Sequence, residues 1–92
     1  DGIPMILMGD FNVFLYNLCI VELDKEMTSA RTSAIDSDTK GSYNGWGTAE
    51  RVIDYIYYSG FSQCPVFKVI DKTYAKVPYI SDHYPLFTIL QF

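Results

Sequence analysis

Three short polar clusters interrupt otherwise apolar stretches of this 92-residue sequence. They are Gly9-Asp10-Phe11-Asn12, the aspartate of Ile53-Asp54-Tyr55-Ile56, and Ser81-Asp82-His83-Tyr84-Pro85. Carboxylates, amides and imidazoles hold cations, contact phosphoryl oxygens and transfer protons. The sequence therefore carries the functional groups of a hydrolytic or metal-binding site, provided that the fold brings them together.

The first cluster follows an apolar run that ends at Gly9. In an extended chain, side chains two positions apart share a face, so Asp10 and Asn12 are expected to point the same way and Phe11 into the core. A carboxylate beside an amide at a strand end can bind water, a metal ion or a phosphoryl oxygen. The alternative is that Asp10 caps the following helix, which aspartate commonly does.

The second and third clusters could form a pair. Asp54 lies among apolar residues, and a buried aspartate requires a hydrogen-bonding partner. His83 is the single histidine of the chain. A carboxylate that accepts a hydrogen bond from one ring nitrogen fixes the tautomer and favours the protonated ring, which suits a general acid or a phosphate contact. The alternatives are a salt bridge between Asp54 and Arg51, and a purely structural role for His83.

The elements that must position these clusters are predicted from hydrophobic periodicity. A short continuous apolar run predicts a first strand that is buried on both faces, and apolar residues at helical spacing predict one helix. Alternation and apolar runs predict three further strands. The expected elements are strands over 3–8, 52–59, 66–71 and 84–92, a helix over 14–27, a polar loop over 28–42 that can hold a short helical turn, and a turn over 60–65.

Two finer expectations concern turns and faces. Asn44 and Gly45 tolerate positive φ, so they predict a two-residue hairpin flanked by Tyr43 and Trp46. In the last strand, alternation predicts two different faces. Leu86, Thr88 and Leu90 are expected on one face, and Phe87 and Ile89 on the other.

Composition limits the class of protein. The chain is 49% hydrophobic and 20% charged, with a net charge of −4 and a pI near 4.6, which is typical of a folded domain and not of a disordered one. Its basic residues are scattered singly, so no extended nucleic-acid track is expected. Cys19 and Cys64 have apolar neighbours and are expected to be buried free thiols. No run approaches the ~20 apolar residues of a membrane span, and the sequence assigns no compartment.

The order of the three clusters resembles the C-terminal motif set of the endonuclease/exonuclease/phosphatase superfamily. The resemblance spans residues 3–92, and Tyr43 and Trp46 are similar to the aromatic segment that precedes the Ile-Asp motif in members of that family. It implies an α/β fold that is part of a four-layered α/β/β/α, DNase I-like sandwich. Residues 1–92 would be the C-terminal half of that domain, with mostly antiparallel strands, and the domain would be incomplete.

The resemblance also implies residue roles and a cofactor. Asp10 would orient or deprotonate the attacking water, and Asn12 would hold the scissile phosphate. Asp54 would pair with His83, and His83 would contact the phosphoryl group. Asp82 would lie beside a Mg²⁺ or Mn²⁺ ion, directly or through water, and Asp10 is the second candidate metal ligand. The implied chemistry is in-line displacement by water on a phosphoester, whether a small molecule, a lipid head group or nucleic acid.

The sequence departs from the family in lacking its N-terminal half, with the glutamate that is the main metal ligand. We therefore expect these residues to act as part of a longer enzyme, to be nearly inactive alone, and to pack against the absent half or self-associate. One alternative is a non-catalytic remnant that lacks the metal-binding glutamate. Another is a small β-rich binding module in which Asp54 and His83 form a structural pair. Trp46 and Tyr43 either stack on a base or sugar or pack within the protein.

Overall fold

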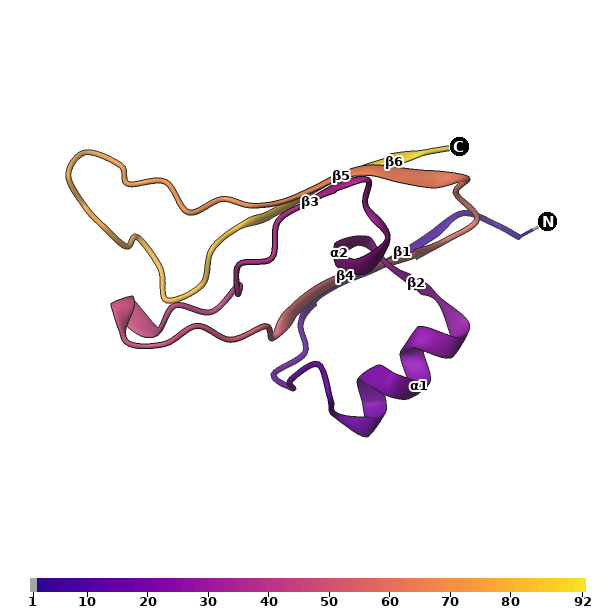
Figure 1. The fold of residues 1–92 in the computed structure, drawn as a ribbon, viewed down its shortest axis with the longest axis horizontal. Coiled ribbons are helices and arrows are strands. Elements are labelled where there is room, and N and C mark those ends of the chain that lie inside the picture. Colours follow the sequence, from indigo (N-terminus) through magenta and orange to yellow (C-terminus); the bar gives the residue numbers. More distant parts are fainter. Residues whose placement is uncertain (1) are drawn as a thin grey trace.

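The computed structural model describes residues 2–92, which form a small mixed α/β domain with two sheets of three strands each (Figure 1). Strand order is β1-β4-β2 in the first sheet and β3-β5-β6 in the second. Only the β3–β5 pair is parallel among these residues, which confirms the predicted α/β class with mostly antiparallel strands. The elements are β1 (Met5–Asp10), α1 (Leu18–Glu26), β2 (Thr28–Ser29), α2 (Ala30–Ser33), β3 (Asp36–Ser37), the 3-10 helix η1 (Gly45–Gly47), β4 (Asp54–Ser59), β5 (Gln63–Val69) and β6 (Leu86–Gln91).

Two apolar cores define three layers. Helix α1 packs on one face of the first sheet, and the second sheet packs on its other face (Figure 1). Side chains alternate along β4, so this strand contributes to both cores. The core between helix and sheet contains Ile20, Tyr55 and Tyr57. The core between the sheets contains Ala30, Ile56, Tyr58, Cys64, Phe67 and Val69.

Helix α1 begins four residues later than predicted. The Asn17 side chain accepts a hydrogen bond from the Cys19 backbone N–H at 2.8 Å, which satisfies a free donor at the start of the helix. The helix ends at Glu26, and the N–H of the following residue, Met27, donates to the Leu23 carbonyl at 2.9 Å. Tyr16 therefore precedes the helix and is exposed.

A hydrogen bond between side chains attaches α1 to the first sheet. The Tyr57 hydroxyl donates to the Asp24 carboxylate at 2.7 Å. Burial and this carboxylate together raise the pKa of Tyr57 well above its usual value. Ile20, the one fully buried side chain of the helix, packs in the same core. Apolar packing and one charge-assisted hydrogen bond thus fix the helix on the sheet.

Strand β1 contradicts the prediction of a strand buried on both faces. All of its residues are exposed, and Met8 retains 68% of its accessible surface. Strand β1 is the edge strand next to β4, and neither apolar core includes a β1 side chain, so both of its faces stay uncovered. Strand β6 is likewise an edge strand, and its predicted alternation is confirmed, with Leu86, Thr88 and Leu90 half-buried and Phe87 and Ile89 exposed.

The segment predicted as a polar loop, 28–42, contains β2, the short helix α2 and β3. Strand β5 starts at Gln63 rather than Val66, so the turn that precedes it is shorter than predicted. Pro65 lies within this strand at an irregularity in the pairing with β6, where a residue without an N–H is tolerated.

The predicted Asn44-Gly45 hairpin is wrong. Asn44 caps η1 instead, and its side-chain oxygen accepts from the Trp46 N–H at 2.8 Å. Trp46 adopts a φ of 58° and is exposed. Tyr43 bridges to both Arg51 and His83. The chain therefore folds back through a wider loop, closed by two backbone hydrogen bonds between Tyr43 and Arg51, and not through a two-residue turn.

Two smaller expectations have clear outcomes. Cys64 is buried as predicted, whereas Cys19 is exposed because it lies on the outer side of the first turn of α1. Among residues 2–92, no helix is long and apolar enough to cross a bilayer.

Candidate active site

The register of the first sheet brings Asp10 and Asp54 together. They are direct partners in the antiparallel pairing of β1 with β4. The pairing is extended by the Phe11 N–H, which donates to the Ile53 carbonyl at 2.9 Å. Cross-strand neighbours have Cβ atoms about 5 Å apart, so two carboxylates from different clusters lie side by side.

His83 joins this pair from the segment that leads into β6. Its Nδ1 lies 2.7 Å from Asp54 Oδ2, and its Nε2 lies 3.7 Å from Asp10 Oδ2. One ligand atom from each of the three residues lies within 4.8 Å of the others. The expected contact between Asp54 and His83 is confirmed, and Asp10 belongs to the same cluster.

The electrostatics of the cluster favour a charged imidazole. The hydrogen bond to Asp54 raises the pKa of His83 above its ordinary value, and the charges of Asp54, Asp10 and Asp82 act in the same direction. Burial opposes this effect without reversing it. The Tyr43 ring meets the imidazole edge-on, with 5.3 Å between ring centroids. The ring is thus held by one carboxylate and packed against one aromatic residue.

The remaining predicted residues lie nearby but contribute differently. Asp82 Oδ1 is 3.9 Å from His83 Nε2, so Asp82 is at the rim of the cluster. Asn12 has a φ of 57°, so the chain is not extended beyond Asp10 and the argument that the two side chains share a face does not hold. Its backbone N–H donates to Asp10 Oδ1 at 2.8 Å. Phe11 stacks on Tyr55 in the core, as predicted.

The two local alternatives for the aspartates are wrong. Helix α1 is capped by Asn17 and not by Asp10. Arg51 makes no ion pair with Asp54 in the described part of the chain. Its Nη1 donates to the Glu50 carbonyl at 2.9 Å, and its guanidinium lies 5.8 Å from the centroid of the Phe14 ring. Both carboxylates are therefore available to the cluster.

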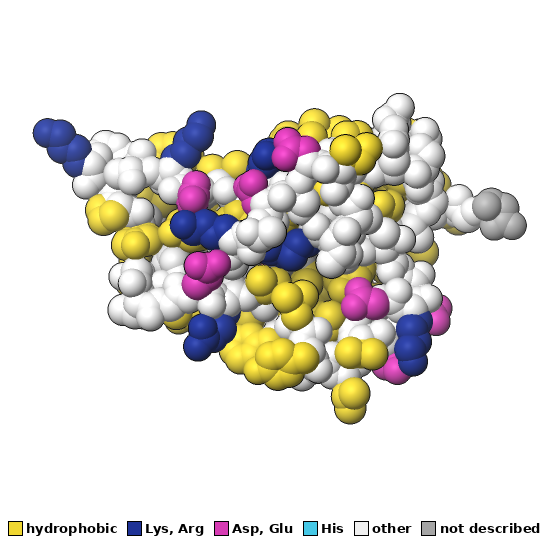
Figure 2. All heavy atoms as spheres, viewed as in Figure 1, with side chains coloured by type: hydrophobic (Ala, Val, Ile, Leu, Met, Phe, Trp, Pro, Cys, Tyr) yellow, Lys and Arg dark blue, Asp and Glu magenta, His cyan; other side chains and the backbone are white. Residues whose placement is uncertain are grey.

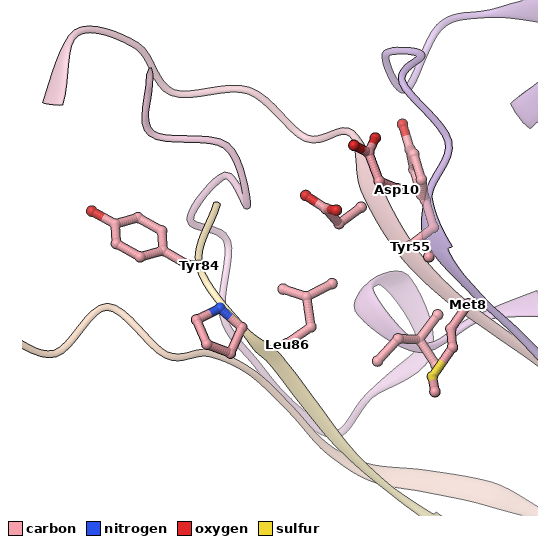
Figure 3. A pocket seen from close by; sticks show the side chains of 9 residues that line it. Met8, Asp10, Tyr55, Tyr84 and Leu86 are labelled. Carbon is pink, nitrogen blue, oxygen red and sulfur yellow. The ribbon is translucent and has the colours of Figure 1, made fainter. Parts of the chain in front are cut away.

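A cavity of about 360 Å³ adjoins the two carboxylates (Figure 3). Asp10 lies at its polar end, and Met8 and Leu86 line its apolar end. Tyr84 and Pro85, which follow His83, form another wall. Such a volume is within the range of small-molecule sites, so the cluster is accessible to a ligand with a polar and an apolar part.

Sequence reasoning missed two buried polar residues behind the site, Ser42 and Asn44. Ser42 Oγ accepts hydrogen bonds from the Ile53 and Asp54 N–H groups at 3.2 and 3.0 Å. The Asn44 amide donates to the Ser81 carbonyl at 3.1 Å. Their spacing of two around Tyr43 was a usable signal, because alternate polar residues share a face of an extended chain.

The donor set is compatible with a divalent cation. Mg²⁺ is bound by oxygen ligands and usually retains several waters, so one or two carboxylates are enough on the protein side. Asp10 and Asp54 supply adjacent carboxylates, and the Asp10 side chain is 47% exposed, which leaves room for water. His83 Nδ1 is occupied by Asp54, so the oxygen atoms are the natural ligands.

Comparisons of the chain with models of protein families, with curated proteins and with solved structures gave no match.

Proposed function

We propose that this chain contributes most of the active site of a divalent-metal-dependent phosphoesterase, which cleaves its substrate by in-line attack of water. Within this proposal, residues 1–92 are the C-terminal portion of an endonuclease/exonuclease/phosphatase-type domain and act as part of a longer enzyme. The observation that carries the proposal is the convergence of Asp10, Asp54 and His83 from three separate segments on one accessible cluster. Asp10 and Asp54 line a cavity, and a group of titratable side chains in such a place is a candidate functional site.

The proposed role of each residue follows from its contacts. Asp54 accepts a hydrogen bond from His83 Nδ1–H and holds the ring, as the orienting carboxylate of an acid–base pair does. His83 would then present a protonated Nε2 to a phosphoryl oxygen, since this nitrogen faces Asp10 at 3.7 Å rather than being hydrogen-bonded. Asp10 would orient or deprotonate the attacking water. Asn12 would contact the scissile phosphate, next to Asp10 at the end of β1.

A divalent cation, when bound, would neutralise the negative charge that develops on the phosphoryl oxygens. Asp10 and Asp82 are the proposed ligands, and Asp54 lies close enough to assist. Mg²⁺ or Mn²⁺ suits a set of carboxylate oxygens and waters.

Substrate class is open to a small molecule, a lipid head group or a nucleic acid. The cavity has room for a small phosphoester that carries an apolar part, because Met8 and Leu86 line it beside Asp10. On the face seen in Figure 2, the basic side chains form no continuous band that could follow a duplex backbone. Trp46, exposed on η1, is a candidate for stacking on a base or sugar.

A non-catalytic remnant is the second candidate. It is favoured by the composition of the cluster, which contains no glutamate among residues 2–92. In this case the chain would retain the Asp54–His83 contact but bind a cation weakly.

Hydrolysis of bis(p-nitrophenyl) phosphate, with and without Mg²⁺, separates the two candidates when it is measured on the longer enzyme that the proposal implies. We expect metal-dependent hydrolysis and a loss of at least about 100-fold in kcat/KM for His83→Ala. The matched control is Asp36→Asn, which removes an exposed carboxylate paired with Lys68 in the second sheet. Metal-dependent turnover that is unchanged in His83→Ala would contradict the role of His83. No turnover at all would support the remnant.

A further inference from the structure

The segment 42–44 touches both chain segments that carry the catalytic pair. Ser42 is completely buried and Asn44 is 3% exposed, which is unusual for polar residues without internal partners. Both side chains are hydrogen-bonded within the protein. The segment therefore connects the start of β4 to the segment that carries His83.

Ser42 makes contacts in two directions. Its Oγ accepts from the N–H groups of Ile53 and Asp54, just where β4 begins. Its backbone carbonyl accepts from the Tyr84 N–H at 2.7 Å, one residue after His83. One buried residue thus fixes the backbone on both sides of the 2.7 Å contact between Asp54 and His83.

Asn44 continues the connection on the His83 side. Its backbone N–H donates to the Asp82 carbonyl at 2.8 Å, and its side-chain amide donates to the Ser81 carbonyl. The loop before β6 is long and largely exposed between residues 71 and 80, so it offers little rigidity of its own. The hydrogen bonds between residues 42–44 and residues 81–84 hold the end of this loop in place.

We infer that Ser42 is a positioning residue for the candidate active site. Its side chain holds the backbone of Asp54 in place, and its carbonyl holds the backbone of Tyr84, next to His83. As far as catalysis is concerned, this inference rests on the proposed function. The alignment of Asp54 with His83 can be tested without it. Removing the hydroxyl would leave two N–H groups without an acceptor at the start of β4 and allow Asp54 to move.

The test uses the single histidine of the chain as a reporter. In the ¹⁵N-labelled 92-residue protein, the nitrogen chemical shifts of the neutral ring show which nitrogen carries the proton. We expect the proton on Nδ1 in the wild type, because the Asp54 carboxylate accepts a hydrogen bond from Nδ1–H. In Ser42→Ala we expect the proton to be distributed between Nδ1 and Nε2. Ser42→Cys keeps the shape with a poorer acceptor, and we expect an intermediate distribution.

The matched control is Ser29→Ala. Ser29 is also buried, and its hydroxyl also accepts a backbone N–H, that of Thr32, but it lies in β2 away from His83. We expect wild-type ring shifts in this variant. A Ser42→Ala protein with wild-type ring shifts overturns the inference and makes Ser42 a purely structural residue. If Ser42→Ala does not fold, the ring shifts of Ser42→Cys test the inference, and wild-type shifts in that variant overturn it. Rapid hydrogen exchange of the Ile53 and Asp54 amides in the wild type would also overturn it.

The activity of the longer protein provides the second measurement. We expect Ser42→Ala to lower kcat by up to about 100-fold with little change in KM, since misplacement of a catalytic pair affects the transition state. A wild type without activity contradicts the proposed function, and the ring shifts then still decide the role of Ser42.

Discussion

Asp10 and Asp54 are direct cross-strand partners at the end of the β1–β4 ladder, and His83 approaches both of them. Like charges directly opposite one another in a sheet are destabilising. Here a protonated imidazole offsets part of the repulsion, because Nδ1 contacts one carboxylate and Nε2 faces the other. The stability of the fold and the charge of the site are therefore linked.

The first prediction concerns pH. The pKa of His83 is raised in the folded protein, mainly by its hydrogen bond to Asp54. A group with a raised folded pKa contributes its full stabilisation below the unfolded pKa of about 6.5. This contribution is lost as the pH rises through the folded pKa. We expect the difference in unfolding free energy between wild type and His83→Gln, measured by urea denaturation, to decrease over that range. A pH-independent difference would contradict the linkage.

The second prediction concerns metal. We expect Mg²⁺ to raise the melting temperature, because ligand bound to the folded state stabilises it by about 2.7 kcal/mol at 100 times the Kd. Asp10→Asn should abolish this increase. It should stabilise the metal-free protein or leave its stability unchanged, since one of two negative charges that face each other across the strands is removed. Calorimetry with and without Mg²⁺ measures both effects. Asp36→Asn is the control and should respond to Mg²⁺ as the wild type does.

The third prediction concerns the attachment of α1. Tyr57→Phe removes the hydroxyl that donates to Asp24 and leaves the ring in the core. We expect a loss of about 1.5–3 kcal/mol of unfolding free energy, the typical range for a hydrogen bond to a charged group. Tyr16→Phe changes the same atom on an exposed residue and should have no effect. Equal effects of the two changes would exclude a specific role for the Tyr57–Asp24 contact.

The fourth prediction concerns the core between the sheets. Phe67 is 1% exposed, whereas Phe87 on the neighbouring strand is 49% exposed. Phe67→Ala should cost about 3–5 kcal/mol, which is enough to unfold many domains of this size. Phe87→Ala should stay within about 0.5 kcal/mol. Chemical denaturation of the two variants tests whether β5 contributes the central side chain of this core.

The fifth prediction concerns association. Strands β1 and β6 are both edge strands, and a groove of about 570 Å³ opens between residues of the two, including Ile6, Met8 and Leu90. Apolar edges without charges favour pairing with another chain. We expect the 92-residue chain to self-associate, and Met8→Lys to weaken this more than Val21→Lys on α1. Sedimentation equilibrium that shows a monomeric wild type would contradict the prediction.

The sequence was informative wherever one residue type stood out against its surroundings. Asp54 within an apolar strand and a single histidine next to an aspartate could each be recognised, and their contact at 2.7 Å confirms the pairing. Strand and helix types were also predicted, since their periodicities differ. Their ends were not, because the cap at Asn17 and the bulge at Pro65 depend on local hydrogen bonds.

Other features could not be predicted because they depend on neighbours in space. Strand β1 is exposed because neither apolar core covers its faces, which an apolar run does not encode. The spacing of Ser42 and Asn44 indicates a shared face, but the complete burial of Ser42 results from the packing of two distant segments around it. The Asn44-Gly45 pair has the preferences of a hairpin, but contacts to Ser81 and Asp82 override them.

Asn12 has a left-handed backbone conformation, so the residue at this position must tolerate a positive φ whether or not it contacts a substrate. Few residue types other than glycine and asparagine accept this conformation without strain. A glycine there would preserve the reversal of direction after β1 yet remove the amide, whereas a valine would retain bulk and strain the chain beside Asp10. Comparing Asn12→Gly with Asn12→Val therefore separates the chemistry of this side chain from the geometry of its peptide.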